Sequence, residues 1–290
     1  MFTGVCTALV TPFTNDKVDL KALDALIDRQ IDAGVSALLA CGTTGEPSTL
    51  TDQEWTLVVR RTIERAAGRV KVIVGTGSNN LAHTLEKARI AKDLGADAQL
   101  CVTPYYNKTT QDGLIAFFSR IADDSALPVI LYNVPARTGL TMQPKTVEKL
   151  SHHENIAGIK EAGGSLNVMA ELLRMCRLPL YCGNDELNAT ALRLGACGLI
   201  SVLSNLIPAE TVRLYNEVIA GNHQTAEARQ LALTPLIAAL FCEVSPVPAK
   251  AALAMMGLCN DDVRLPLVCM QSENKRILKA ALKEKGLLED

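Results

Sequence analysis

The chain has 290 residues, and its 29 Lys and Arg nearly balance its 31 Asp and Glu, which leaves a formal net charge of −2. Hydrophobic residues make up 48% of the sequence, enough to bury a large core, and this excludes a disordered chain. The charge balance excludes the basic excess that nucleic-acid binding requires. We therefore expect a folded, globular protein with no nucleic-acid partner.

Location in the cell is indicated by what the sequence lacks. No apolar run reaches the ~18 residues of a membrane span, and residues 1–5 lack the charged region of a signal peptide. The nine Cys are odd in number, and no two are spaced as CxxC. We expect them to be small buried hydrophobes in a reducing compartment. The sequence thus predicts a cytoplasmic protein without membrane contact and without a cysteine metal site.

Eight short apolar runs, rich in β-branched residues, recur along the first 202 residues. They are apolar on both faces, as strands of a parallel sheet covered by helices are. We therefore predict eight buried strands. The runs are 5–10, 37–41, 70–75, 98–102, 128–133, 156–160, 180–183 and 198–202.

The longer segments between these runs have the pattern of amphipathic helices. In residues 20–31, Leu and Ile recur at helical spacing, and Thr51 with Glu54 forms a capping box at the start of another helix. One strand and one helix together recur about every 25–35 residues, the period of βα units. Eight such units, with no GxGxxG turn after the first strand, favour a closed (β/α)8 TIM barrel over an open doubly wound sheet.

The last part of the chain changes character. Residues 224–240, 249–256 and 272–288 have helical patterns with no strand between them. We predict a catalytic barrel at 1–221 and a C-terminal helical region at 222–290 that packs on it. Because no low-complexity linker separates the two, this region is not expected to fold independently.

The active site of a (β/α)8 barrel lies at the carboxyl ends of its strands, so the residues that close each run are the candidates. Lys160 closes the sixth run, which is otherwise apolar. Burial disfavours the ammonium form of a lysine, and a neutral amine can attack a carbonyl. The alternatives are a lysine that reaches solvent or one that pairs with a carboxylate, and the position alone leaves these open.

Other strand ends carry groups suited to proton transfer or substrate binding. Tyr132 closes the fifth run, where its hydroxyl can relay a proton or its ring can simply pack in the core. Thr43 and Thr44 stand in a glycine-rich turn after the second run, which either binds a carboxylate or is an ordinary polar turn. Arg137, after the fifth run, offers a planar fork for a carboxylate, or is surface charge.

The remaining strand ends give weaker indications. Tyr105 and Tyr106 follow the fourth run, and because adjacent residues point in different directions, one can face a site or a partner chain. Gly183 and Ile200 stand where the seventh and eighth runs can approach a ligand closely. No histidine closes a strand, which favours a covalent mechanism without a metal ion or other cofactor. The histidines are His83 and His223, with His152 and His153 expected at the opposite end of the barrel.

Four motifs together resemble a known family: GTTGE at 42–46, TPYYN at 103–107, YNVP at 132–135 and GIKE at 158–161. Their order and their places at strand ends resemble the pyruvate-dependent, Schiff-base-forming lyases and synthases. Within these, the chain is most similar to the dihydrodipicolinate synthase family, over essentially its whole length. The resemblance implies condensation of pyruvate with aspartate semialdehyde through an imine on Lys160, in lysine and diaminopimelate biosynthesis, with no cofactor.

The resemblance also implies a role for each candidate residue. Tyr132, Thr43 and Tyr106 are implied to form a proton relay, with Tyr106 reaching in from a neighbouring subunit of a homotetramer built as a dimer of dimers. Thr44 is implied to bind the pyruvate carboxylate, and Arg137 the semialdehyde carboxylate. The residues implied to line the pocket are Gly183 and Ile200.

Two alternatives differ from this assignment. The first is another pyruvate-dependent aldolase, such as N-acetylneuraminate lyase or 2-keto-3-deoxygluconate aldolase. The matching loop of those enzymes commonly lacks the arginine that stands here at Arg137. The second is a barrel that binds a small acid without catalysis. The complete set of strand-end residues argues against it, namely Lys160, Tyr132, Thr43 and Arg137.

One departure from the family pattern concerns regulation. Many bacterial members are inhibited by lysine at a dimer-interface site, and Asn79 and Tyr105 match that site here. Trp55 and His83 stand where a His and a Glu are expected, so a carboxylate for the lysine ammonium group is missing. The sequence therefore predicts weak or absent inhibition by lysine at this degenerate site, which also includes Ser48.

Overall fold

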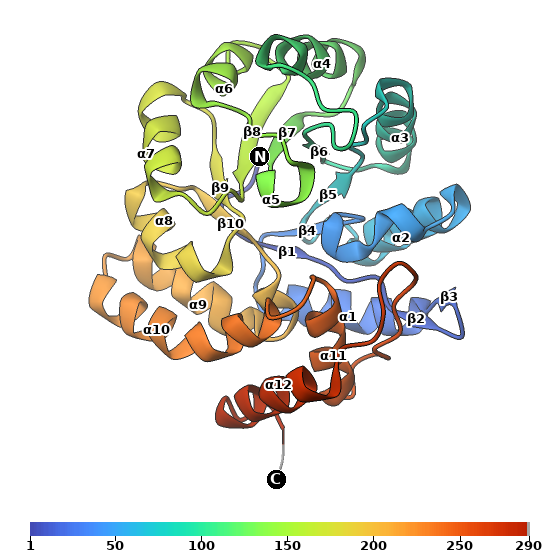
Figure 1. Cartoon of the computed structure of the whole chain (residues 1–290), viewed down its shortest axis with the longest axis vertical. Helices are drawn as coiled ribbons and strands as arrows, with labels where there is room; N and C mark the ends of the chain where they lie inside the picture. The colour runs from blue at the N-terminus through green and yellow to red at the C-terminus, as the bar shows by residue number, and fades with distance from the viewer. Residues whose placement is uncertain (289–290) are drawn as a thin grey trace.

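The computed structural model describes residues 1–288, which form a closed barrel of eight parallel strands surrounded by helices (Figure 1). The strands follow the order β1-β10-β9-β8-β7-β6-β5-β4 around the barrel, and β4 pairs with β1. The predicted (β/α)8 fold is therefore confirmed, and each apolar run overlaps one strand. The strands are β1 (Gly4–Ala8), β4 (Ala37–Ala40), β5 (Lys71–Gly75), β6 (Ala98–Val102), β7 (Val129–Asn133), β8 (Ile156–Glu161), β9 (Leu180–Cys182) and β10 (Gly198–Ser201).

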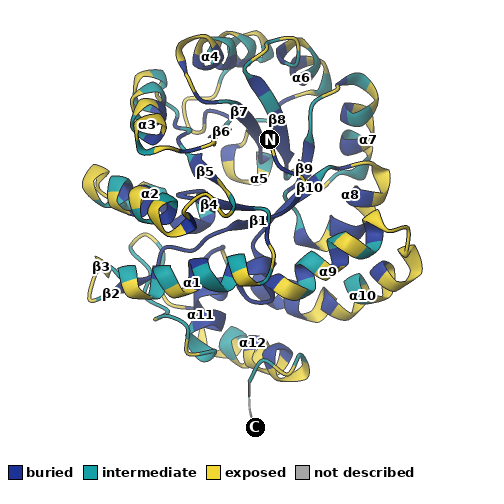
Figure 2. Ribbon diagram, turned by 180° about the vertical axis from the view of Figure 1, so that it is seen from behind, coloured by how far each residue is buried: buried dark blue, intermediate teal, exposed yellow. Residues whose placement is uncertain are grey.

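Helices cover the outside of the barrel and turn their buried faces toward it (Figure 2). The predicted capping box is present, because the Thr51 hydroxyl accepts from the Glu54 N–H while the Glu54 carboxylate accepts from the Thr51 N–H. The helices of this layer are α1 (Leu20–Asp32), α2 (Asp52–Ala66), α3 (Leu81–Leu94), α4 (Gln111–Asp124), α6 (Pro144–Leu150), α7 (Leu166–Met175), α8 (Asn188–Leu194) and α9 (Pro208–Ile219).

A small antiparallel hairpin of β2 (Phe13–Thr14) and β3 (Lys17–Val18) is absent from the sequence-based prediction. Its turn residues, Asn15 and Asp16, have φ angles of 52° and 59°, the left-handed conformation that a two-residue type I′ turn requires. Strands of two residues are too short to produce a hydrophobic alternation. The Asn-Asp pair is therefore the only local signal of this hairpin.

The interior of the barrel is filled by mostly apolar side chains from its strands, including Cys6, Leu39, Ile73, Leu100, Ile130, Tyr132, Tyr181 and Ile200. At the amino end of the strands, Phe2 stacks on Tyr181 with ring centroids 4.3 Å apart, and the Tyr181 hydroxyl donates to Phe2 O. A larger core lies between the strands and the surrounding helices. The barrel is thus a packed core that is closed at its amino end.

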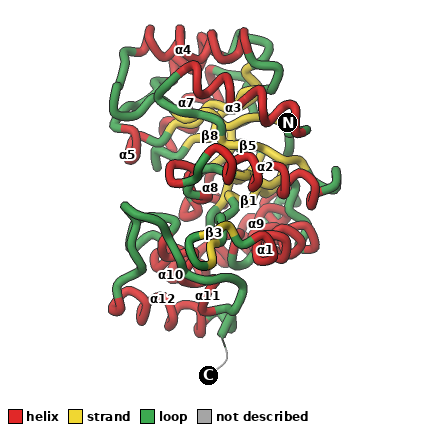
Figure 3. The backbone as a smooth tube through the Cα atoms, turned by 90° about the vertical axis from the view of Figure 1, so that its right-hand side faces the viewer, coloured by secondary structure: helices red, strands yellow, loops and turns green. Residues whose placement is uncertain are grey.

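The C-terminal helices gather on one side of the barrel, as Figure 3 shows, and they are α10 (His223–Leu240), α11 (Val247–Met255) and α12 (Ser272–Glu284). One hydrophobic cluster joins them to the barrel through Val10, Leu26 and Leu206. The proposed division between 1–221 and 222–290 falls between α9 and α10 and stays a prediction. Over residues 1–288, none of the helices combines the length and the hydropathy of a membrane span.

Candidate active site

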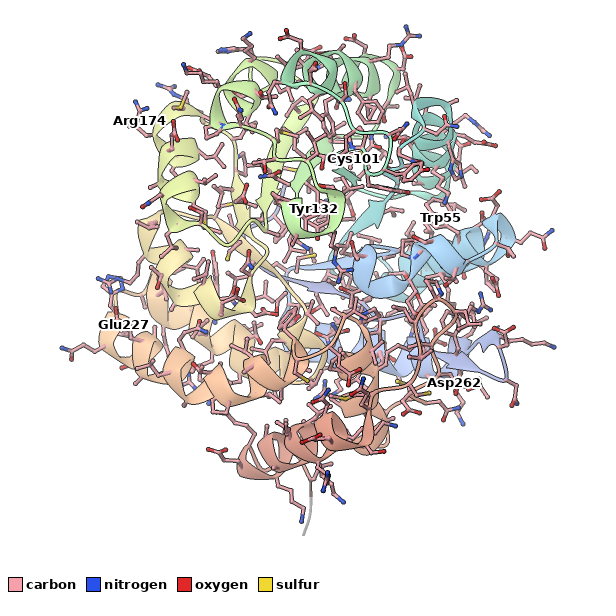
Figure 4. All side chains as sticks on the ribbon, in the orientation of Figure 1. Trp55, Cys101, Tyr132, Arg174, Glu227 and Asp262 are labelled. Atoms are coloured by element: carbon pink, nitrogen blue, oxygen red, sulfur yellow. The ribbon has the colours of Figure 1, made fainter. Side chains whose placement is uncertain are left out.

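A cavity of about 310 Å³ opens at the carboxyl end of the barrel, where (β/α)8 enzymes keep their active sites. Segments that follow the neighbouring strands β4, β5, β6 and β7 make most of its wall, and two segments of the C-terminal region complete it. Figure 4 shows Tyr132 near the middle of the ring of strands. The predicted residues found in the wall are Thr43, Ser48, Tyr105, Tyr132 and Arg137.

Lys160 lies in β8 beside Tyr132 of β7, and its Nζ is 4.5 Å from the centre of the Tyr132 ring. The two residues are register partners in neighbouring parallel strands, so their side chains share one face of the sheet. Lys160 is 6% exposed, and within residues 1–288 it makes no ion pair. A solvent-exposed lysine and a carboxylate-paired lysine are therefore both disfavoured, and a buried amino group beside a tyrosine remains.

The residues that follow Tyr132 and Lys160 point to the opposite face and are hydrogen-bonded to each other. Asn133 Nδ2 donates to Glu161 Oε2 at 2.8 Å, and Gly163 N donates to Glu161 Oε1 at 2.6 Å. Burial raises the pKa of the Glu161 carboxyl, and these two hydrogen bonds oppose the shift. The pair ties β7 to β8 next to the candidate nucleophile. Sequence reasoning missed it, although both residues stand in the quoted motifs.

Gly183 follows β9 and leaves room for the Lys160 side chain. A Cβ atom at this position would lie 2.8 Å from Lys160 Cε and 2.8 Å from Ala162 Cβ, so any side chain would displace the lysine. Ile200, in β10, is buried in the same interior cluster as Tyr132. Neither Gly183 nor Ile200 belongs to the cavity wall. The structure therefore places them in the buried surroundings of Lys160 and Tyr132.

Thr43 and Thr44 begin a 3₁₀ turn, Thr43–Gly45, that comes shortly after β4. Thr43 lines the cavity, whereas Thr44 is buried and lies outside the wall. Thr11, in the segment that follows β1, holds the turn because its Oγ1 donates to Gly45 O at 2.7 Å. The predicted carboxylate-binding turn is thus a fixed element at the edge of the cavity.

Arg137 lies in the short helix α5 (Pro135–Thr138), which follows β7. Its side chain lines the cavity, and its Nη2 donates to Ser245 O at 2.9 Å. Ser245 belongs to the segment between α10 and α11. The C-terminal region therefore holds Arg137, the candidate residue for binding a carboxylate, at the cavity. No local sequence signal indicates this contact.

Tyr105 and Tyr106 both follow β6 but have different surroundings. Tyr105 lines the cavity, whereas Tyr106 is 93% exposed and lies outside the wall. The φ of Tyr106 is 67°, a left-handed conformation that is uncommon for a bulky residue. A single chain therefore does not bring Tyr106 together with Tyr132 and Thr43.

The residues predicted for the degenerate lysine site are divided between the cavity and its surroundings. Ser48 and Tyr105 line the cavity. Asn79 lies next to them in space, because its Nδ2 donates to Tyr105 O at 3.3 Å. These three residues are therefore close enough to form one site.

Trp55 and His83, the two departures from the family pattern, are engaged by other parts of the chain. Trp55 is buried, and its indole N–H donates to Gly75 O at 3.4 Å. His83 Nε2 lies 3.7 Å from Asp52 Oδ1. Sequence reasoning missed Lys87, which lines the cavity and places its Nζ 5.2 Å from the centre of the Trp55 ring.

Metal-ligating side chains do not gather in the described part of the chain, since residues 1–288 contain no group of three or more His, Cys, Asp or Glu placed to hold a metal ion. The nine Cys are free thiols, and burial raises the pKa of Cys41 to about 12. His153 lies before β8, at the amino end of the barrel, and its Nε2 is 2.9 Å from Asp123 Oδ1.

These features define a class of protein: a (β/α)8 barrel whose sixth barrel strand carries a buried lysine next to a tyrosine at the open end. The sequence profile of the dihydrodipicolinate synthetase family matches residues 1–285. The chain belongs to this family.

Relatives match the chain over its whole length. The curated 4-hydroxy-tetrahydrodipicolinate synthase of Acetivibrio thermocellus is 46% identical over 290 residues, which cover 99% of each chain. The chloride-inhibited dihydrodipicolinate synthase of Acinetobacter baumannii, complexed with pyruvate, is 40% identical with a TM-score of 0.97, and the match covers 99% of this chain and 100% of that one. The DHDPS of Cyanidioschyzon merolae with lysine bound is 37% identical, with a TM-score of 0.96 and 99% of both chains covered.

Proposed function

We propose that the chain catalyses the condensation of pyruvate with L-aspartate 4-semialdehyde to give 4-hydroxy-tetrahydrodipicolinate, a lyase reaction of lysine and diaminopimelate biosynthesis. The observation that carries the proposal is the buried Lys160 beside Tyr132 at the carboxyl end of the barrel. Relatives named for this activity match the chain along its whole length, and a solved relative is complexed with pyruvate.

Lys160 supplies the nucleophile of the proposed reaction. Its amine attacks the ketone carbon of pyruvate, and loss of water leaves an imine. The protonated imine withdraws electrons, so a methyl proton leaves, and the resulting enamine attacks the aldehyde carbon of the semialdehyde. The amino group of the semialdehyde then attacks the imine carbon, closes the ring and releases Lys160 as a free amine.

Each of these steps moves protons, and we assign their transfer to Tyr132, Thr43 and Tyr106. Tyr132 and Thr43 both line the cavity. Tyr106 is exposed and lies outside the cavity of its own chain, which supports its supply to the site of a neighbouring subunit. The relay therefore requires at least a dimer, and we propose a homotetramer built as a dimer of dimers. The biosynthetic relatives support a cytoplasmic location.

Two substrate carboxylates have to be bound. We assign the carboxylate of pyruvate to Thr44 and its turn, and that of the semialdehyde to Arg137. A guanidinium binds a carboxylate through two parallel N–H···O bonds, and Arg137 presents its fork in the cavity wall. Gly183 and Ile200 shape the buried part of the pocket around Lys160.

Incubation with pyruvate and borohydride tests the proposal. Reduction converts an imine into a stable secondary amine, so peptide mapping should find a pyruvate-derived adduct on Lys160, and Lys160→Met should abolish it. An adduct on another lysine, or no adduct, would overturn the proposal. Turnover of aspartate semialdehyde, set against cleavage of N-acetylneuraminate and 2-keto-3-deoxygluconate, then separates the proposed enzyme from other pyruvate-dependent aldolases.

We also propose that lysine inhibits this enzyme weakly or not at all. Lys87 places its ammonium group next to Trp55, where it repels a second cation, and Trp55 itself is buried. A steady-state titration should show little inhibition at millimolar lysine. Half-maximal inhibition at sub-millimolar lysine would contradict this prediction.

A further inference from the structure

An ion pair that the proposed reaction does not use connects the C-terminal region to the end of β4. Lys250, in α11, places its Nζ 2.7 Å from Glu46 Oε1, and the two side chains are 0% and 1% exposed. Taking two charges out of water can cost more than their attraction returns, so such a pair is a weak source of net stability. Its complete burial is better explained by a role in positioning.

Glu46 completes the turn that begins at Thr43. Its N–H donates to Thr43 O at 3.2 Å, and its φ of 53° is left-handed, a strained conformation that persists where the surroundings impose it. Lys250 holds one carboxylate oxygen of Glu46, and the Arg264 N–H lies 3.4 Å from the other. The conformation of the turn therefore depends on two residues of the C-terminal region.

Lys250 has no direct access to a substrate. It is fully buried and lies outside the cavity wall, whereas Glu46 is part of that wall. The Phe13 ring also fixes the ammonium group, whose Nζ is 4.1 Å from the ring centre. Burial lowers the pKa of Lys250, and the carboxylate of Glu46 opposes the shift. The charge of Lys250 therefore reaches the cavity through Glu46, its hydrogen-bonded partner in the wall.

We propose that Lys250 and Glu46 are positioning residues that hold the turn Thr43–Gly45 in the geometry that binds the pyruvate carboxylate. The C-terminal region then sets the affinity for pyruvate without contacting pyruvate. This inference rests on the proposed function, in which the turn binds that carboxylate and Lys160 carries the imine.

The experiment measures the borohydride-trapped adduct on Lys160 as a function of pyruvate concentration. Lys250→Met keeps a linear side chain of similar length and removes its charge. We expect the pyruvate concentration at half-maximal trapping to rise about tenfold, because the turn loses one charge-assisted contact. In the turnover assay, the KM for the semialdehyde should stay within about twofold, because Arg137 binds the backbone oxygen of Ser245, a contact that does not involve the Lys250 ammonium group. A general loss of packing would instead weaken the binding of both substrates.

A second variant covers the case in which Lys250→Met fails to fold, because that change leaves the Glu46 carboxylate buried and unpaired. Combining Glu46→Gln with Lys250→Met removes both charges and should also raise the half-saturating concentration of pyruvate. The matched control is Lys275→Met in the same region, since Lys275 Nζ pairs with Asp261 Oδ2 at 2.6 Å with both side chains about one third exposed.

The control should trap pyruvate as the wild type does. Wild-type half-saturation in the double variant would overturn the inference, as would an equal loss of affinity for both substrates. Absence of an adduct on Lys160 in the wild type would instead overturn the proposed function, so the two failures are distinguishable.

Discussion

Two tyrosines flank Lys160 in the barrel wall, and they occupy opposite environments. Tyr132 in β7 and Tyr181 in β9 are both register partners of Lys160, and both belong to the interior cluster. The Tyr181 hydroxyl donates to Phe2 O at 3.0 Å, and its ring stacks on that of Phe2. Tyr132 lines the open cavity, and its hydroxyl has no hydrogen-bond partner among residues 1–288.

The difference follows from the end of the barrel that each ring faces. The first residues of the chain close the amino end, so a hydroxyl there must find its partner within the protein, and burial raises the pKa of Tyr181. The carboxyl end is open, so a hydroxyl there is available to a substrate. The same residue type is therefore tied into the fold at one end and left available to a ligand at the other, in line with the division between structural and functional ends that (β/α)8 barrels share.

Tyr132→Phe is expected to have the largest effect of the changes considered, and this effect should be on turnover and not on stability. Turnover should fall by roughly 10²–10⁴, the usual effect of removing a general acid or base. The midpoint of thermal unfolding should change little, because this hydroxyl has no hydrogen bond to lose within residues 1–288. Steady-state kinetics and thermal denaturation measure the two effects, and near-normal turnover would contradict the proton relay.

Two glycines, Gly183 and Gly198, allow a glycine-to-alanine change to be compared at the two ends of the barrel. A Cβ at Gly183 meets Lys160 Cε at 2.8 Å, whereas a Cβ at Gly198 meets Gly4 O at 2.6 Å and Tyr181 Cδ1 at 3.2 Å. Gly183→Ala should reduce the rate of imine trapping roughly 10²-fold by misplacing the amine. Gly198→Ala should instead lower the free energy of unfolding by about 1–3 kcal/mol.

Trapping rates measured on folded protein, together with urea unfolding curves, distinguish these outcomes. The rate in Gly198→Ala should remain close to that of the wild type, because this glycine packs at the closed end. If both variants trapped pyruvate equally slowly, the separation between a catalytic end and a structural end would be lost.

The barrel and the strand-end residues could be predicted because their signals are local. Each strand is one apolar run, and Lys160 and Tyr132 stand out as polar residues that close such runs. The contacts that fix the site join residues far apart in the sequence. Arg137 and Ser245 are 108 residues apart, and Glu46 and Lys250 are 204 apart, so no spacing rule indicates either pair.

Other residues of the candidate site could not be predicted, because their position depends on tertiary packing or on a second chain. The sequence places Tyr106 at a strand end, and the proposed relay takes it from a second copy of the chain, which no pattern within one sequence describes. Lys87 was missed because a lysine on an exposed helix face is ordinary, and its place in the cavity wall follows from how α3 packs against α2. The helices after residue 222 were predicted, whereas the contribution of Ser245, in the segment between α10 and α11, to the cavity was not.

Tyr181→Phe should have a smaller effect than the preceding variants, and on stability rather than on turnover. The change leaves the Phe2 carbonyl without its donor in a closed part of the barrel. We expect the free energy of unfolding to fall by about 1–2 kcal/mol, with turnover within about twofold of the wild type. A large loss of activity at unchanged stability would show that the amino end also takes part in catalysis.

The dependence of this stability difference on pH sharpens the comparison further. In the unfolded chain the Tyr181 hydroxyl ionises with a pKa of about 10, whereas burial keeps it protonated to higher pH in the folded chain. Above about pH 10 the unfolded state therefore loses a proton first, and stability that is fully present at lower pH declines by up to about 1.4 kcal/mol per pH unit. Phenylalanine cannot ionise, so the advantage of the wild type over Tyr181→Phe should shrink as the pH rises. Urea unfolding of both proteins between about pH 8 and pH 11 measures this, and a constant difference would mean that the fold does not hold the Tyr181 proton.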